Sequence, residues 1–303
     1  MRITITGATG RIGAGLVEAL LARGDDVTVL TRNPEKAAQA LGPAVEAVPW
    51  DPESGPAPAE ALNGRDAVVH LAGEDVGQRW SKAVKQRIRS SREAGTRNLV
   101  EGLRQADPRP AALISASAAG YYGPRGDEPV DESAQPGDDF LAQVVVAWEA
   151  EAARAAELGI RVARLRTGVV LDKEGGALKQ MLPPFRAGVG GPVAGGRQYL
   201  PWIHRDDVVG VYLAAIGGGD EWSGAINVAA PRPVTNREFS KALGRALHRP
   251  AIAPVPKPAL KLLFGEMSTI VTSGVNMVPK RLEELGYAFR HPELDGALAA
   301  ALD

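Results

Sequence analysis

The stretch RITITGATGRIG, residues 2–13, decides the fold class of this chain. A β-branched, alternating run that stops at glycine indicates a strand followed by a tight turn. Apolar residues then recur at helical spacing as far as Leu20, which indicates a helix. In the order strand, glycine loop and helix, the glycines let the backbone approach a pyrophosphate, and the helix N-terminus stabilises the negative charge of the pyrophosphate. The residues assigned to this dinucleotide contact are Gly7, Thr9, Gly10, Arg11, Ile12 and Gly13.

The residues after the second predicted strand, 27–30, indicate which dinucleotide binds. Thr31 and Arg32 stand about 18 residues after Gly13, where an NAD-specific site places a carboxylate on the ribose 2′-hydroxyl. Arg32 instead offers a planar fork of donors, which suits a 2′-phosphate. We therefore predict NADP(H) as the cofactor. The alternative is that Arg32 is an ordinary solvated surface residue.

The composition excludes several classes of function. Lys plus Arg number 35 against 36 Asp plus Glu, a net charge of −1, so nothing indicates a nucleic-acid partner. The absence of cysteine excludes disulfides, thiolate metal sites and cysteine nucleophiles. Without a leader or an apolar run of membrane length, we expect a cytoplasmic protein that binds no membrane. The expected partner is a small-molecule substrate, and the sequence leaves a homodimer open.

Short apolar runs alternate with helical stretches along the chain, which is typical of a parallel sheet covered by helices. Further strands are predicted at 44–48, 67–71, 111–116 and 161–166. Asn33-Pro34 and Ser81 are predicted to begin helices, and another helix spans 138–158. We expect an α/β fold with a Rossmann-type doubly wound parallel sheet over residues 1–166, to which segments at about 198–230 return. Residues 167–303 form a smaller C-terminal α/β substrate-side region, including a C-terminal module at about 253–303.

These motifs resemble those of the extended short-chain dehydrogenases/reductases, the superfamily of the nucleotide-sugar epimerases. The resembling segments span nearly the whole chain, at 6–13, 70–73, 115–123, 202–207 and 227–229. More narrowly, the chain is similar to the YfcH-type epimerase-like subfamily. That likeness rests on LAGE (71–74), GYYG (120–123), FLA (140–142), WE (148–149), the glycine-rich 188–196 and a C-terminal module between 254 and 287.

The resemblance implies further cofactor contacts after the third and fourth predicted strands. Trp50 and Asp51 close the third strand near the expected adenine. The cofactor crosses the sheet beside the residues that close the fourth strand, Leu71, Ala72 and Gly73. Glu74 follows there and can accept from a ribose hydroxyl. Arg79 can pair with a phosphate, or else it is a long solvated side chain.

The chemistry of the superfamily needs a serine, a tyrosine and a lysine four residues after that tyrosine. The tyrosine, with an ordinary pKa of about 10, is a poor base unless a nearby cation lowers its pKa. The helix that should carry this pair reads DDFLAQVVVAWE over 138–149, without tyrosine, lysine or arginine. Phe140 or Leu141 takes the tyrosine position, and Val144 or Val145 takes the lysine position. The usual acid–base pair is missing.

Three hydroxyl groups remain as candidates for catalysis. Ser117, Tyr121 and Tyr122 follow the fifth strand at the carboxyl edge of the sheet, where ligands bind in such folds. The alternative is that the two tyrosines pack in a glycine-bounded turn. His248 and His291 have no partner at metal-ligand spacing, so no metal site is predicted.

Two classes of function therefore stay open. The first is an NADP-dependent oxidoreductase or epimerase-like enzyme that acts on an unknown carbonyl or sugar-nucleotide-like substrate through a non-standard proton-transfer set. The second is a non-catalytic NADP-binding sensor or scaffold. The missing tyrosine–lysine pair favours the second class, whereas a C-terminal module that would enclose a pocket favours the first. We expect the enzyme-like function.

Overall fold

The computed structural model describes residues 1–303 and is organised around a seven-stranded parallel sheet in the order β10-β6-β5-β4-β1-β2-β3. The strands are β1 Arg2–Thr6, β2 Asp26–Thr31, β3 Glu46–Pro49, β4 Ala67–His70, β5 Ala112–Ala118, β6 Arg161–Thr167 and β10 Gly224–Val228. The strand order reverses between β1 and β4. In doubly wound sheets, ligands bind in the crevice at the carboxyl ends of such strands.

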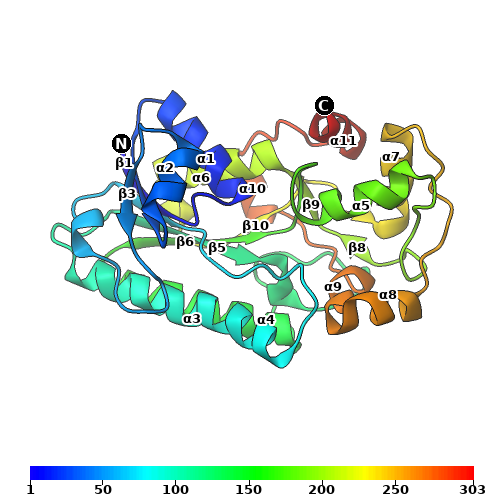
Figure 1. The fold of residues 1–303 in the computed structure, drawn as a ribbon, viewed down its shortest axis with the longest axis horizontal. Coiled ribbons are helices and arrows are strands. Elements are labelled where there is room, and N and C mark those ends of the chain that lie inside the picture. The colour runs from blue at the N-terminus through cyan, green and yellow to red at the C-terminus, as the bar shows by residue number, and fades with distance from the viewer.

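Helices cover both faces of this sheet, with α1 and α6 on one face and α3 and α4 on the other (Figure 1). Their bounds are α1 Arg11–Ala22, α2 Pro34–Leu41, α3 Lys82–Gln105, α4 Phe140–Ala153 and α6 Arg205–Gly217. Leu16 of α1 and Tyr212 of α6 belong to one hydrophobic core, and Leu99 and Leu103 of α3 belong to a second core across the sheet. This arrangement confirms the predicted Rossmann-type fold.

The predicted strands are all present, with bounds that differ by up to two residues. The third strand, predicted at 44–48, is β3 at Glu46–Pro49, and the fifth extends to Ala118. The caps form as predicted, since the Asn33 side chain accepts from the Lys36 N–H and Ser81 accepts from the Val84 N–H. The helix predicted at 138–158 begins at Phe140 and, after Ala153, tightens into a 3₁₀ turn over Arg154–Leu158.

A smaller region forms from residues that follow β6, whereas α6 and β10 lie with the main sheet. In the smaller region β7 pairs with β9, and β8 pairs with β11. Its elements are β7 Val169–Leu171, α5 Gly176–Arg186, β8 Tyr199–Leu200, β9 Trp202–His204, β11 Val234–Thr235, α7 Asn236–Ala246, α8 Lys257–Phe264, α9 Ser268–Thr272 and α11 Leu294–Leu302. The short helix α10 Lys280–Glu284 packs against β10 of the main sheet instead. Phe185, Trp202, Phe239 and Leu298 pack in one core that joins α5, β9, α7 and α11.

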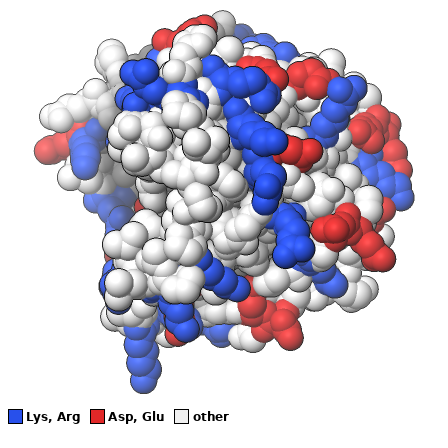
Figure 2. All heavy atoms as spheres, turned by 90° about the vertical axis from the view of Figure 1, so that its right-hand side faces the viewer, with Lys and Arg blue, Asp and Glu red and all other residues white.

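The outer surface of this smaller region combines uncharged side chains with charges of both signs. Figure 2 views the molecule from that side and shows uncharged surface bordered by Lys and Arg, with Asp and Glu side chains among them. Ile252 and Leu262 lie in this region and are 80% and 78% exposed. None of the helices has the length and hydropathy that crossing a membrane would require.

Candidate functional site

The glycine loop joins β1 to α1, and its three glycines differ in how much space the structure leaves for a side chain. Gly7 has a positive φ of 69°, and a Cβ there would lie 2.7 Å from the carbonyl carbon of Leu71. A Cβ on Gly13 would lie 2.5 Å from the Gly7 carbonyl oxygen. A Cβ on Gly10 would meet only that same oxygen, at 3.2 Å, and Gly10 is the N-cap of α1 without a side-chain cap. The loop therefore packs through Gly7 and Gly13 and presents open backbone at Gly10.

A buried hydrogen-bonded chain fixes the end of β4 beside this loop. Thr6 Oγ1 accepts the backbone N–H groups of Leu71 and Ala72, each at 3.2 Å, and contacts His70 Nδ1 at 2.7 Å. His70 Nε2 lies 2.9 Å from Thr96 Oγ1. Burial lowers the pKa of His70 to about 4, so its ring is neutral at neutral pH. His70 thus positions the backbone of residues 71–73 and does not face a ligand.

The predicted adenosine end lies after β2 and β3. Arg32 is exposed and makes no hydrogen bond or ion pair within the chain, which leaves its guanidinium free for a ligand. Thr31 Oγ1 accepts the N–H of Asn33, and Asp51 Oδ1 accepts the N–H of Glu53. Trp50 is only 7% exposed because its ring packs in the core of the α3 face. Any adenine contact at residue 50 is therefore made by the backbone or by a ring edge.

Two arginines assigned to the cofactor are held by other partners. Arg11 donates to both carboxylate oxygens of Asp172, at 2.8 and 3.0 Å, and pairs with Glu174 at 2.8 Å. Arg79 Nη1 donates to the carbonyl of Leu262, at 3.3 Å, near the end of α8. Arg79 therefore ties the C-terminal helices to the main region, and its predicted phosphate contact stays a prediction. This partner could not be predicted from the sequence because α8 is distant along the chain.

Glu74 lies beside the cofactor path with its carboxylate already hydrogen-bonded. Its Oε1 accepts from Gln78 Nε2 at 3.0 Å and from Arg87 Nε at 3.2 Å. These two donors, the Gln78 hydrogen bond above all, lower the pKa of Glu74. Glu74 is thus an anion at neutral pH, and an anion can accept from a ribose hydroxyl as predicted.

A cavity of about 270 Å³ lies at the carboxyl ends of β5 and β6, under α4 and α9. Its walls include Ala118, Leu141, Val145, Gly168 and Ile270. Leu141 and Val145 are spaced as the superfamily's tyrosine and lysine. Their side chains also lie within 4 Å of the Cβ position of Gly120, in the loop after β5. Val144 lines the cavity as well but Phe140 does not, so 141 and 145 is the register in which both positions face the cavity, and there the pair is replaced by hydrocarbon.

Arg92 of α3 also lines this cavity and was not singled out by the sequence. Its Nη1 donates to the carbonyl of Glu74 at 2.9 Å and to that of Ile88 at 3.3 Å, and its guanidinium carbon lies 5.1 Å from the ring of Trp148. Burial lowers the pKa of Arg92 to about 10, so it stays charged at neutral pH. Several arginines occur on α3, and nothing in their spacing distinguishes Arg92.

Two of the three predicted catalytic hydroxyls belong to a buried network outside the cavity lining. Ser117 donates to Glu149 Oε1 at 2.6 Å, and Arg166 donates to both oxygens of Glu149, at 2.8 and 2.9 Å. Tyr122 accepts from Arg166 at 2.9 Å and donates to Asn227 Oδ1 at 2.6 Å. All five side chains are buried. Their hydrogen bonds are satisfied within the protein, so Ser117 and Tyr122 do not reach a ligand in this arrangement.

Tyr121, the third predicted hydroxyl, is partly exposed. The guanidinium carbon of Arg166 lies 3.4 Å from the centre of its ring, a cation–π contact. Its hydroxyl makes no hydrogen bond within the chain and is not part of the cavity lining. The structure thus supports the alternative reading of the two tyrosines as packing residues.

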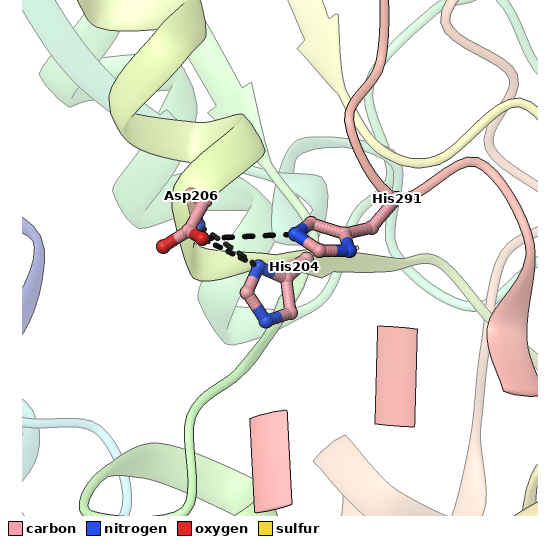
Figure 3. Close-up of side chains that lie close together, drawn as sticks. All are labelled: His204, Asp206 and His291. Carbon is pink, nitrogen blue, oxygen red and sulfur yellow. Dashed lines mark hydrogen bonds and ion pairs between the residues drawn. The ribbon is translucent and has the colours of Figure 1, made fainter. Parts of the chain in front are cut away.

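A histidine cluster at the start of α6 was missed by the sequence analysis (Figure 3). His204 Nδ1 and His291 Nε2 lie 3.7 and 3.6 Å from Asp206 Oδ2, and the two rings are 3.9 Å apart. The spacing could suit a metal ion. However, His204 Nδ1 already accepts the Asp206 N–H at 3.1 Å, and Arg205 Nε lies 3.9 Å from Asp206 Oδ1. We therefore assign the cluster to helix capping.

The fold and the glycine loop define a class of proteins, and comparison with known families agrees. The model of the NAD dependent epimerase/dehydratase family matches residues 3–229, and that of a domain of unknown function, DUF1731, matches residues 255–301. The chain belongs to the NAD-dependent epimerase/dehydratase family.

Particular relatives resemble the chain over its full length. It is 40% identical to the epimerase family protein SDR39U1 homolog, chloroplastic, of Arabidopsis thaliana, over 100% of this chain and 87% of that protein. It is 36% identical to the human epimerase family protein SDR39U1, over 98% of both chains.

Solved structures agree with these relatives. A crystal structure of human SDR39U1 (isoform2) with NADPH matches with a TM-score of 0.87 and 35% identity, and it covers 100% of both chains. A UDP-glucuronic acid 4-epimerase from Bacillus cereus, in complex with UDP-glucuronic acid and NAD, matches at a TM-score of 0.80 over 99% of this chain and 98% of that one. At 19% identity, this second likeness shows the fold alone.

Proposed function

We propose that this chain binds NADPH and uses it to reduce a small carbonyl compound, without the tyrosine–lysine pair of its superfamily. The observation that carries the cofactor choice is the free, exposed guanidinium of Arg32 at the end of β2. The human relative whose structure was solved with NADPH supports the same choice. Open backbone at Gly10 and the uncapped N-terminus of α1 suit the pyrophosphate.

The groups of the chain fit this cofactor from end to end. Arg32 holds the 2′-phosphate, the amides that follow Gly10 hold the pyrophosphate, and Glu74 accepts from a ribose hydroxyl. When bound, NADPH supplies a hydride from its nicotinamide ring. Leu141 and Val145 exclude water from the cavity in which that ring meets the substrate.

Carbonyl reduction also consumes a proton, and the cavity offers few groups to deliver it. Asp139 is the one carboxylic side chain in the lining, and its Oδ1 accepts the N–H of Ala142 as the cap of α4. Tyr199 also lines the cavity and has a hydroxyl that makes no hydrogen bond within the chain, so the proton comes from water, from Tyr199 or by way of Asp139. Without the lysine that activates the superfamily's tyrosine, the reaction is slow compared with that of a complete acid–base set.

The second candidate function is a non-catalytic NADPH sensor or scaffold. The hydrocarbon at Leu141 and Val145 favours it, because these side chains can move no proton. The same cofactor site serves both functions, so only turnover separates them.

Binding and turnover measurements together test the proposal. NADPH and NADH are titrated against the full chain by fluorescence. NADPH deuterated at nicotinamide C4 is then incubated with a panel of aldehydes and ketones, and deuterium transfer is followed by mass spectrometry. Transfer with NADPH preference supports the reductase. Tight NADPH binding without transfer to any compound supports the sensor, and failure to bind either cofactor contradicts both.

A further inference from the structure

The cavity at the ends of β5 and β6 offers few partners for the many polar groups of a nucleotide sugar. Its volume of about 270 Å³ lies just below the roughly 300–1,000 Å³ of typical small-molecule sites. Of its 22 lining residues, 12 are hydrophobic. A nucleotide sugar would bring phosphates and several hydroxyls, and each buried polar group without a partner is costly. The walls therefore favour a compact, mainly apolar ligand.

Three of the four hydroxyl groups in the lining are already hydrogen-bonded to the backbone. Thr269 Oγ1 donates to the Glu266 carbonyl at 2.8 Å, and Ser273 Oγ donates to the Thr269 carbonyl at 2.6 Å. Thr167 Oγ1 donates to the Leu165 carbonyl at 3.2 Å. Since each of these three hydroxyls gives its proton to the backbone, they can only accept from a ligand. Tyr199 lines the cavity as well, and its hydroxyl makes no hydrogen bond within the chain, so it is free to contact a polar group of the ligand.

Arg92 brings to the cavity a positive charge without a direct ion pair, although the carboxylates of Asp75 and Glu74 act on it from beyond ion-pair distance. No carboxylate of the chain lies within ion-pair distance of it, and only its Nη1 donates, to two backbone carbonyls. A Cβ on Gly73 would lie 3.2 Å from the guanidinium carbon, so the guanidinium lies directly against the backbone that follows β4. A guanidinium with free N–H groups in a largely apolar cavity binds a carboxylate well, since the planar fork matches it.

We propose that this cavity binds a compact, mainly apolar substrate with a single carboxylate, which pairs with Arg92. The proposal deepens the proposed function and rests on it, because the reducible end of the substrate must meet the nicotinamide in the same cavity. Asp139 adds a negative charge at the start of α4, which keeps the carboxylate of the substrate away from that end. The substrate class is thus an apolar oxo acid.

Three probes of one shape but different charge test this assignment on the full chain saturated with NADPH. They are phenylacetate, its neutral amide phenylacetamide and the cation phenethylamine, and UDP-glucose is the fourth ligand. Calorimetric titration should show phenylacetate binding at least about tenfold more tightly than the amide, as expected for one charge-assisted contact. Phenethylamine and UDP-glucose should bind more weakly than phenylacetate.

Variants of two arginines on α3 test whether the charge of Arg92 gives the preference for phenylacetate over phenylacetamide. Arg92→Gln should remove the preference for phenylacetate over phenylacetamide, and Arg92→Lys should keep part of it. The matched control is Arg104→Gln, an exposed residue in the last turn of the same helix, which should leave the preference unchanged. Circular dichroism and NADPH titration of each variant show that it is folded.

The outcomes separate the two proposals. If the wild-type chain does not bind NADPH, the proposed function itself fails. If NADPH binds but the acid and the amide bind equally, or UDP-glucose binds more tightly than the acid, only the substrate assignment is overturned. If Arg92→Gln and Arg92→Lys weaken NADPH as much as phenylacetate, the guanidinium serves the cofactor and the assignment is also overturned.

Discussion

The Ser117 hydroxyl donates a 2.6 Å hydrogen bond to Glu149 Oε1, and both side chains are only 4% exposed. Glu149 also receives two hydrogen bonds from Arg166, so one buried carboxylate joins β5, α4 and β6. Buried ionic groups of this kind are strongly destabilising when one partner is lost. The loop after β5 is therefore held in place by a network that uses the very hydroxyls that sequence reasoning assigned to catalysis.

Replacing Ser117 tests whether that hydroxyl is structural. Ser117→Ala should lower the free energy of unfolding by about 1–3 kcal/mol, because the buried Glu149 oxygen loses a donor. Urea denaturation measures this change, and NADPH affinity should stay within about threefold of wild type. A variant of unchanged stability whose deuteride transfer falls more than tenfold would restore Ser117 as a catalytic residue.

Removing the Arg32 side chain tests the choice between the two cofactors. Arg32→Ala should weaken NADPH binding roughly tenfold to a hundredfold, since about 1.5–3 kcal/mol of charge-assisted contact is lost. NADH binding should not change, because NADH lacks the 2′-phosphate. The measurement is a fluorescence titration with both cofactors. Equal affinities of the wild-type chain for NADPH and NADH would contradict the assignment.

A side chain at Gly10 should block the pyrophosphate without unfolding the chain. Gly10 has a φ of −73°, which any residue adopts, and its Cβ would meet only the Gly7 carbonyl oxygen at 3.2 Å. Gly10→Val should therefore fold, by circular dichroism, and lose measurable NADPH binding. Gly296→Val is the control, because a Cβ on Gly296 meets nothing within 4 Å. Tight NADPH binding by folded Gly10→Val would show that the loop is assigned wrongly.

Sugar-nucleotide epimerisation should be absent or very slow. The side chains of Phe140, Leu141, Val144 and Val145 supply neither a proton nor a cation, and general acid–base catalysis contributes on the order of 10²–10⁴ in rate. Conversion of UDP-glucose or UDP-glucuronic acid is followed by NMR with either cofactor. Any residual activity should be checked in Tyr121→Phe, since Tyr121 has the one hydroxyl of the three that makes no hydrogen bond. Rapid epimerisation that survives this substitution would mean that the active site lies elsewhere.

The buried ring of His70 predicts that stability falls in mild acid. Its pKa is lowered from 6.5 to about 4 by burial, with a further contribution from Arg92. Because the unfolded chain binds a proton at higher pH than the folded one, the stabilisation is complete above pH 6.5 and is lost as the pH falls toward 4. Between pH 7.5 and 5, the loss at this one group is about 2 kcal/mol. Urea denaturation between pH 7.5 and 5 should show that the free energy of unfolding falls less in His70→Asn than in the wild type. An equal fall in both proteins would contradict the role assigned to His70.

Local patterns in the sequence were enough to predict the sheet, the glycine loop and the missing tyrosine–lysine pair. The β-branched runs, the helix caps at Asn33 and Ser81 and the spacing of Gly7, Gly10 and Gly13 each act within a few neighbouring residues. The absence of Tyr and Lys from 138–149 could likewise be read directly. Only the register of the missing tyrosine–lysine pair remained ambiguous, and the cavity lining assigns its two positions to Leu141 and Val145.

Partners of the polar side chains were decided by the tertiary structure alone. Ser117 meets Glu149, Arg79 meets the end of α8, and His204 meets His291 because the sheet and the C-terminal helices bring distant segments together. A buried charge or hydroxyl must find a partner wherever packing places one, and that choice has no periodicity along the chain. Arg92 shows the same limit: the sequence contains it as one arginine of a helix, and only the fold places its guanidinium at the wall of a cavity without a carboxylate in ion-pair distance.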